Sequence, residues 1–90
     1  MEEKYIVEFT EKAKKDLKKL DKYQAKLIKK WLINNLIDTK FPRKNGKPLN
    51  GTLQGLWRYR VGNYRIIAEI KDKKLIIILI EIGHRKEIYK

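Results

Sequence analysis

The stretch that decides the fold is Leu56–Ile82, which reads LWRYRVGNYRIIAEIKDKKLIIILIEI. Two turn signals divide it, Gly62-Asn63 and Asp72-Lys73, and the segments between them are rich in β-branched and aromatic residues. We therefore predict three consecutive antiparallel strands, over Leu56–Val61, Tyr64–Ile70 and Leu75–Ile82. The last of these strands is apolar on both faces, which predicts a central position in the sheet.

The N-terminal half predicts one more strand and two helices. Tyr5–Phe9 alternates apolar and polar residues, as a short strand does. Thr10 suits the N-cap of a first helix, and Asp21 with Gln24 resembles a capping box that opens a second helix ending at about Ile37. Both tryptophans fall at positions compatible with the core, Trp31 and Trp57. The predicted fold class is α+β: a small antiparallel sheet with the two N-terminal helices packed on one face, in the order β-α-α-β-β-β.

Composition limits the classes of protein to consider. Ninety residues suffice for one small core, so we expect a single domain over residues 1–90. The absence of cysteine excludes disulfides and thiolate metal sites, and one histidine excludes a multi-histidine centre, so no metal or cofactor is predicted. No apolar run reaches the roughly 20 residues of a membrane span, and Met1–Lys4 does not read as a signal peptide. We expect a cytoplasmic protein.

The charge is strongly basic and unevenly distributed. The formal net charge is +12, which indicates a polyanionic partner or an acidic protein partner. Lysines dominate the predicted helices, where a solvated helix face explains them most simply. Between Asp38 and Glu69 there is no acidic residue but seven basic ones. Arginine binds phosphate with a planar fork, so this segment is the candidate for phosphate contacts. Its loop supplies three candidate RNA-binding residues, Arg43, Lys44 and Lys47.

The two-residue turn at Gly62-Asn63 fixes which side chains face each other. It places Arg60 opposite Arg65, and it gives one face an apolar set suited to packing under the helices: Trp57, Tyr59, Val61, Tyr64, Ile66 and Ala68. The other face collects Arg58, Arg60 and Arg65. Like charges directly opposite each other destabilise a sheet, by up to about 1 kcal/mol. Exposure to solvent explains any single arginine, but an anion bound between the three explains the group better.

The C-terminal segment adds further candidates. The third strand of the meander runs antiparallel to the second, so its end returns to the level of Arg65. We expect His84, Arg85 and Tyr89 to reach the arginines there. A lone histidine is often incidental, but His84 is the one side chain whose unperturbed pKa lies near neutrality. Tyr89 either packs against the core or stacks on an unpaired base.

Several motifs carry a family resemblance: Lys47-Pro48-Leu49, the block Trp57–Arg65 (WRYRVGNYR), Ile82–Arg85 and Ile88-Tyr89. They closely resemble RelE toxins of bacterial type II toxin–antitoxin pairs, and the likeness covers nearly the whole chain. The resemblance implies an mRNA endoribonuclease that cuts codons in the ribosomal A site without a metal ion. The implied partners are mRNA, ribosomal RNA and an acidic, RelB-like antitoxin.

By position, the resemblance also assigns catalytic roles, to Arg58, Arg60, Arg65, Arg85 and Tyr89. Two departures affect the choice of general base. The best-studied branch of the family carries lysines where this chain has Arg58 and Arg60, and another branch uses a loop glutamate that this chain lacks. Arginine does not deprotonate. The base is therefore His84, by elimination, or Tyr89, whose phenol pKa surrounding positive charge would lower.

The predicted reaction is attack of a ribose 2′-hydroxyl on its own 3′ phosphate. This reaction needs a base, an acid and fixed positive charge around the transition state. Two other functions remain open from the sequence. One is a ParE-like inhibitor of DNA gyrase that cuts no RNA, and the other is a nucleic-acid-binding module without activity.

Overall fold

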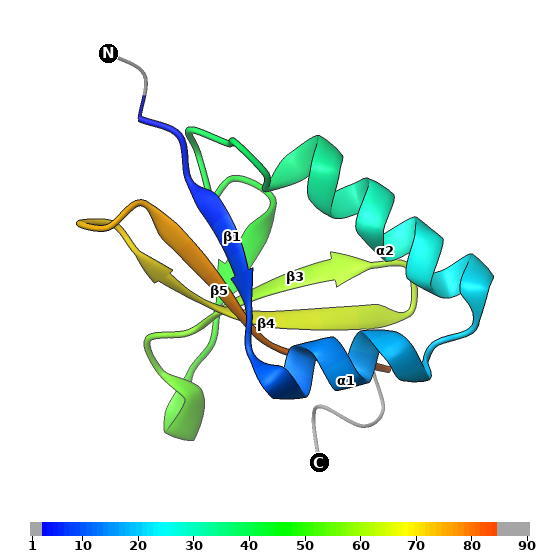
Figure 1. The fold of residues 1–90 in the computed structure, drawn as a ribbon. Helices are drawn as coiled ribbons and strands as arrows, with labels where there is room; N and C mark the ends of the chain where they lie inside the picture. The colour runs from blue at the N-terminus through cyan, green and yellow to red at the C-terminus, as the bar shows by residue number, and fades with distance from the viewer. Residues whose placement is uncertain (1–2, 85–90) are drawn as a thin grey trace.

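The computed structural model describes residues 3–84, which form a five-stranded sheet with two helices (Figure 1). In chain order the elements are β1 (Ile6–Phe9), α1 (Glu11–Lys19), α2 (Lys22–Asn35), β2 (Gly46–Pro48), a 3-10 turn (Gly51–Leu53), β3 (Trp57–Val61), β4 (Tyr64–Lys71) and β5 (Ile76–His84). The predicted α+β class and the order of its six elements are confirmed. No helix within residues 3–84 is long and apolar enough to cross a membrane.

The strand order is β1-β5-β4-β3-β2, so the apolar β5 is interior as predicted. The sheet differs from the expectation in two respects. β1 pairs with β5 in parallel, which makes the sheet mixed, because the alternation of a strand carries no information about its direction. β2 adds an edge strand in the segment that reads as a loop, and its three residues are too few for an alternating pattern.

Both helices begin at the predicted caps. The Thr10 side chain accepts a hydrogen bond from the Ala13 N–H at 3.1 Å, and the Asp21 side chain accepts one from the Gln24 N–H at 2.8 Å. The helices lie on one side of the sheet (Figure 1), and the core forms between the two layers. Its buried members include Ala13, Ile28, Leu32, Tyr59, Ile66, Ile77, Leu79 and Ile82. Neither α1 nor α2 covers the opposite face of the sheet (Figure 1).

A β-bulge interrupts the pairing of β4 with β5. Leu79 pairs with Ala68, but the next pair is Glu81 with Ile67, so Ile80 is an extra residue in β5. One inserted residue moves every later side chain to the other face of the sheet. The last four residues of β5 therefore alternate in the opposite phase from the first four.

Candidate functional site

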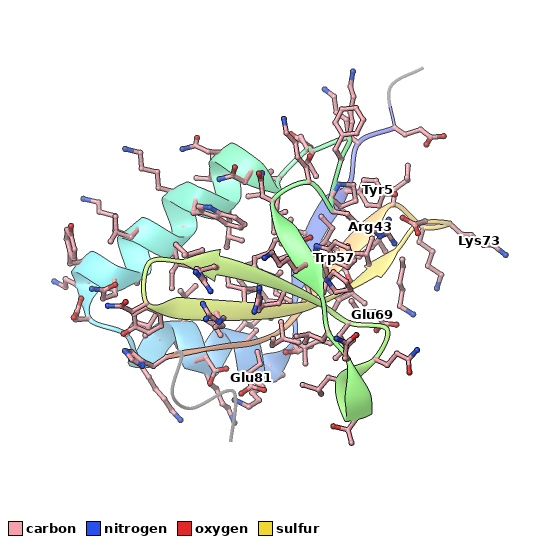
Figure 2. The ribbon with its side chains drawn as sticks, turned by 180° about the vertical axis from the view of Figure 1, so that it is seen from behind. Tyr5, Arg43, Trp57, Glu69, Lys73 and Glu81 are labelled. Atoms are coloured by element: carbon pink, nitrogen blue, oxygen red, sulfur yellow. The ribbon has the colours of Figure 1, made fainter. Side chains whose placement is uncertain are left out.

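The sheet face that points away from the helices carries the predicted arginines, as the hairpin register requires. Arg60 pairs directly with Arg65, and Lys47 of β2 pairs with Arg58. Figure 2 views the molecule from this side, with the helices behind the sheet. We call the four residues Lys47, Arg58, Arg60 and Arg65 the arginine face. The prediction that one two-residue turn brings the three arginines together is confirmed.

A basic cleft of about 300 Å³ lies where the arginine face meets the preceding loop. Its lining residues are Lys44, Asn45, Gly46, Lys47, Arg58 and Arg60. Four of the six are cations and none is a carboxylate. Two of the three predicted RNA-binding residues, Lys44 and Lys47, line this cleft. Because guanidinium and ammonium groups converge here from a loop and two strands, the cleft is suited to a phosphodiester.

The three arginines differ in their exposure. Arg60 is exposed, Arg58 is half-buried, and Arg65 is buried, with an exposed fraction of only 3%. Arg65 lies opposite Gly83 of β5, which presents no side chain against it. A charge that is shielded from water interacts with an anion more strongly than an exposed one. Arg65 is therefore the most shielded cation of the arginine face, and it lies beside the basic cleft rather than in its lining.

Arg43, the third predicted RNA-binding residue, does not line the cleft and forms an ion pair instead. Its guanidinium donates two hydrogen bonds to the Asp72 carboxylate, at 3.0 and 2.8 Å, and lies 5.8 Å from the centre of the Trp57 ring (Figure 2). The Tyr5 hydroxyl donates to the same carboxylate at 2.7 Å. Arg43 thus fastens the loop before β2 to the turn between β4 and β5. The guanidinium fork of Arg43 is thus bonded to a carboxylate in the folded chain.

The Asp72 pair predicts a pH dependence of stability. Hydrogen bonds from Arg43 and then from Tyr5 lower the pKa of Asp72 from its ordinary value of 3.8 to about 2. The folded chain keeps this carboxylate ionised at a lower pH than the unfolded chain does. The stabilisation is therefore present above about pH 4 and is lost as the pH falls to about 2.

Urea unfolding of the wild type and of Asp72→Asn, between pH 7 and pH 2.5, checks this prediction. We expect the wild type to be more stable at pH 7 by up to about 1 kcal/mol, because solvent screens a half-exposed pair. The difference should shrink below pH 4. A difference that stays constant down to pH 2.5 would contradict the assignment.

His84 does not lie on the arginine face, and the expectation that it reaches the arginines is wrong. It pairs directly with Tyr64, and the two rings meet edge to face with centroids 5.6 Å apart. Tyr64 belongs to the face that packs under the helices. The bulge at Ile80 is the cause, because it reverses the phase of the residues that follow it. The other two C-terminal candidates, Arg85 and Tyr89, lie outside the described residues.

Gly46 is a site residue whose role the sequence did not reveal. A Cβ atom at this position would lie 2.4 Å from Trp57 Nε1 and 2.5 Å from the carbonyl oxygen of Arg58. Only glycine allows β2 to approach β3 this closely. In the sequence, Asn45-Gly46 reads as a turn signal, which gives no indication of a close approach between strands. The adjacent Asn45 amide donates to Asn35 at 3.0 Å, which links the loop to α2.

Residues 3–84 contain no group of three or more histidine, cysteine, aspartate and glutamate side chains that could hold a metal ion. The positive charge of the cleft comes from Lys44, Lys47, Arg58 and Arg60. Such a site can bind a phosphate and stabilise added negative charge on it.

Comparison with known proteins places the chain in a family. A model of the ParE toxin of type II toxin–antitoxin system, parDE, matches residues 7–89. Toxin RelG and Toxin RelE of Mycobacterium tuberculosis are each 31% identical over 86 residues, which is 96% of this chain and 97% and 87% of theirs.

Solved structures agree with these relatives. The RelBE2 toxin–antitoxin complex from M. tuberculosis matches with a TM-score of 0.82 and 30% identity, over 91% of this chain and 99% of that one. The intact E. coli RelBE complex matches with a TM-score of 0.70 and 27% identity, over 89% and 95%. The chain therefore belongs to the RelE/ParE family, as a RelE-type toxin of a type II toxin–antitoxin system.

Proposed function

We propose that this toxin is an mRNA endoribonuclease that acts on the ribosome and uses no metal ion. The observation that carries the proposal is the basic cleft, where Lys44, Lys47, Arg58 and Arg60 converge without a carboxylate and Arg65 pairs with Arg60. The lysines and arginines of the cleft can bind phosphates of the mRNA and of the surrounding ribosomal RNA. Binding through so many phosphate contacts should weaken steeply as salt is raised.

In the proposed reaction the 2′-hydroxyl attacks the adjacent phosphorus. A bond forms between the 2′ oxygen and phosphorus, and the bond from phosphorus to the 5′ oxygen breaks. The base takes the 2′-hydroxyl proton, and an acid gives a proton to the 5′ oxygen. The products are a 2′,3′-cyclic phosphate and a 5′-hydroxyl. We assign the non-bridging oxygens to Arg58, Arg60 and Arg65, because fixed cations stabilise the extra charge of the transition state. Arg85 is the proposed further phosphate contact.

We assign proton abstraction to Tyr89, since His84 packs against Tyr64 on the opposite face. Tyr89→Phe should lower the cleavage rate by about 10²-fold or more, which is the usual contribution of a general base. His84→Gln should leave the rate within about threefold, because its ring takes no part in proton transfer. Both rates are measured by primer extension on a defined mRNA in a translating extract. The opposite pattern, a slow His84→Gln and a normal Tyr89→Phe, would reject this assignment.

The proposed protein partner is an acidic, RelB-like antitoxin, as in the RelBE complexes to which the chain is similar. A groove of about 620 Å³ between α1, α2 and β1 supports it. Its apolar lining includes Leu17, Leu20 and Leu32, and its charged lining residues are four lysines, Lys14, Lys18, Lys22 and Lys29. An amphipathic segment with acidic flanks matches this groove in both polarity and charge.

The deciding experiment adds the purified toxin to a translating extract and analyses the ends of the mRNA. The proposal expects new fragments with 2′,3′-cyclic phosphate and 5′-hydroxyl ends, formed only when ribosomes translate the message. The sequence leaves one alternative open, a ParE-like inhibitor of DNA gyrase, and the matching family model carries the ParE name. Intact mRNA together with blocked gyrase supercoiling would overturn the proposal in favour of that function. Intact mRNA together with normal gyrase supercoiling would reject both functions, mRNA cleavage and gyrase inhibition.

A further inference from the structure

The outer edge of β5 is held by two different elements along its length. β1 pairs with β5 from Ile76 to Leu79 and then ends. Beyond Leu79, the N-cap residue Thr10 and a residue of α1 form the contacts with this edge of β5. The Thr10 N–H donates to the Leu79 carbonyl at 3.0 Å, and the Thr10 hydroxyl donates to the Ile80 carbonyl at 2.9 Å. The Ile82 N–H then donates to Asp16 Oδ2 at 3.0 Å.

These contacts lie on both sides of the bulge in β5. The Thr10 hydroxyl bonds the bulged residue, Ile80, and Asp16 bonds the second residue after it, Ile82. A bulge disrupts the local ladder, so a strand that contains one needs other contacts to fix its conformation. The bulge determines which residue of β5 faces Arg65. With it, that residue is Gly83, whose lack of a side chain leaves room for the guanidinium.

Asp16 is also not an ordinary helix-surface carboxylate. Its side chain is only 10% exposed, and Lys12 Nζ lies 3.1 and 3.0 Å from its two oxygens. Lys12 offsets the cost of shielding this charge, and one oxygen of the carboxylate still accepts from the strand. Lys12 and Asp16 are four residues apart on α1, a spacing at which ion pairs commonly form on solvent-exposed helix surfaces. In this protein the Asp16 carboxylate packs against β5 instead, through its hydrogen bond with the Ile82 N–H.

We propose that Asp16 is a positioning residue for the RNA cleavage reaction. By holding the Ile82 N–H, it keeps the bulge in place and Gly83 opposite Arg65, so that the guanidinium stays at its position on the arginine face. Asp16 touches neither RNA nor the reacting atoms. This inference rests on the proposed function, because Arg65 must act on the phosphate for its position to matter.

The kinetic test compares Asp16→Ala, Asp16→Asn and a matched control, Asp21→Ala. Asp16→Ala should lower kcat for mRNA cleavage by about ten- to a hundredfold, with KM within twofold, because a misplaced catalytic group costs turnover. Asp16→Asn should recover kcat to within about threefold, since an amide oxygen still accepts from the Ile82 N–H. Asp21→Ala removes a cap bond of 2.8 Å at the start of α2, which involves no residue of β5, and should leave kcat unchanged.

A second measurement does not depend on activity. Hydrogen exchange at the Ile82 amide should become at least tenfold faster in Asp16→Ala and stay unchanged in Asp21→Ala. Unchanged exchange in Asp16→Ala would overturn the role of Asp16 at the edge of β5. Normal kcat in Asp16→Ala, or an Asp16→Asn variant as slow as Asp16→Ala, would overturn its role in positioning. A wild-type toxin that leaves mRNA intact would instead reject the proposed function, whatever the exchange result.

Discussion

Replacing Arg65 with alanine should lower the rate of mRNA cleavage by about 10²–10³-fold, a loss typical of removing one preorganised charge-stabilising group. Arg65 is the most buried cation of the arginine face, and it lies directly opposite Arg60. A shielded guanidinium interacts more strongly than an exposed one with charge that develops on the phosphate. Single-turnover cleavage of a defined mRNA on programmed ribosomes measures the effect on the chemical step.

The controls separate catalysis from folding and from net charge. Arg65→Lys keeps the charge but loses the fork, so we expect it to recover only part of the rate. Lys73→Ala, in the exposed turn between β4 and β5 (Figure 2), removes one positive charge away from the cleft and should cleave normally. Arg60→Ala tests the same face at an exposed position, where truncation leaves no cavity. An Arg65→Ala toxin that is folded, as judged by urea unfolding, and cleaves as fast as Lys73→Ala would contradict the role of Arg65.

The local parts of this fold could be predicted because short-range rules determine them. Thr10 and Asp21 cap their helices through their own side chains, three residues from the groups that they bond. The turn at Gly62-Asn63 fixes the register of β3 and β4, and the alternation of strands then places Arg58, Arg60 and Arg65 together. None of these steps needs information from a distant part of the chain. The three arginines of the arginine face were therefore predictable from about ten consecutive residues, whereas Lys47 joins them through β2, which was not predicted.

The parts that the sequence did not predict depend on distant contacts. A run of isoleucine and leucine looks the same with or without a bulge, so nothing in it indicates that Ile80 is an extra residue. That single residue places His84 against Tyr64. The role of Arg43 depends on Asp72, which follows 29 residues later. A basic residue in a basic loop reads as a nucleic-acid contact until its partner across the fold is known.

Gly46→Ala should be the most destabilising single-methyl change at the cleft. The added Cβ would overlap both Trp57 Nε1 and the Arg58 carbonyl oxygen, each about 2.5 Å away or closer. The backbone oxygen cannot rotate aside, so β2 must separate from β3. Overpacking of this kind costs roughly 1–3 kcal/mol, and here it also separates Lys47 from Arg58, which form a cross-strand pair. We expect a lower urea midpoint together with weaker binding to ribosomes.

Lys47→Ala is the matched control for Gly46→Ala, because it lies next to it in β2 and its side chain belongs to the opposite face. It removes a cation from the cleft without adding an atom between the strands. Its urea midpoint should equal that of the wild type, while ribosome binding weakens and loses part of its salt dependence. The two variants thus separate the shape of the cleft from its charge. If Gly46→Ala unfolds at the wild-type urea concentration, then β2 can move away from β3 at no cost, and the cleft is not a preformed site.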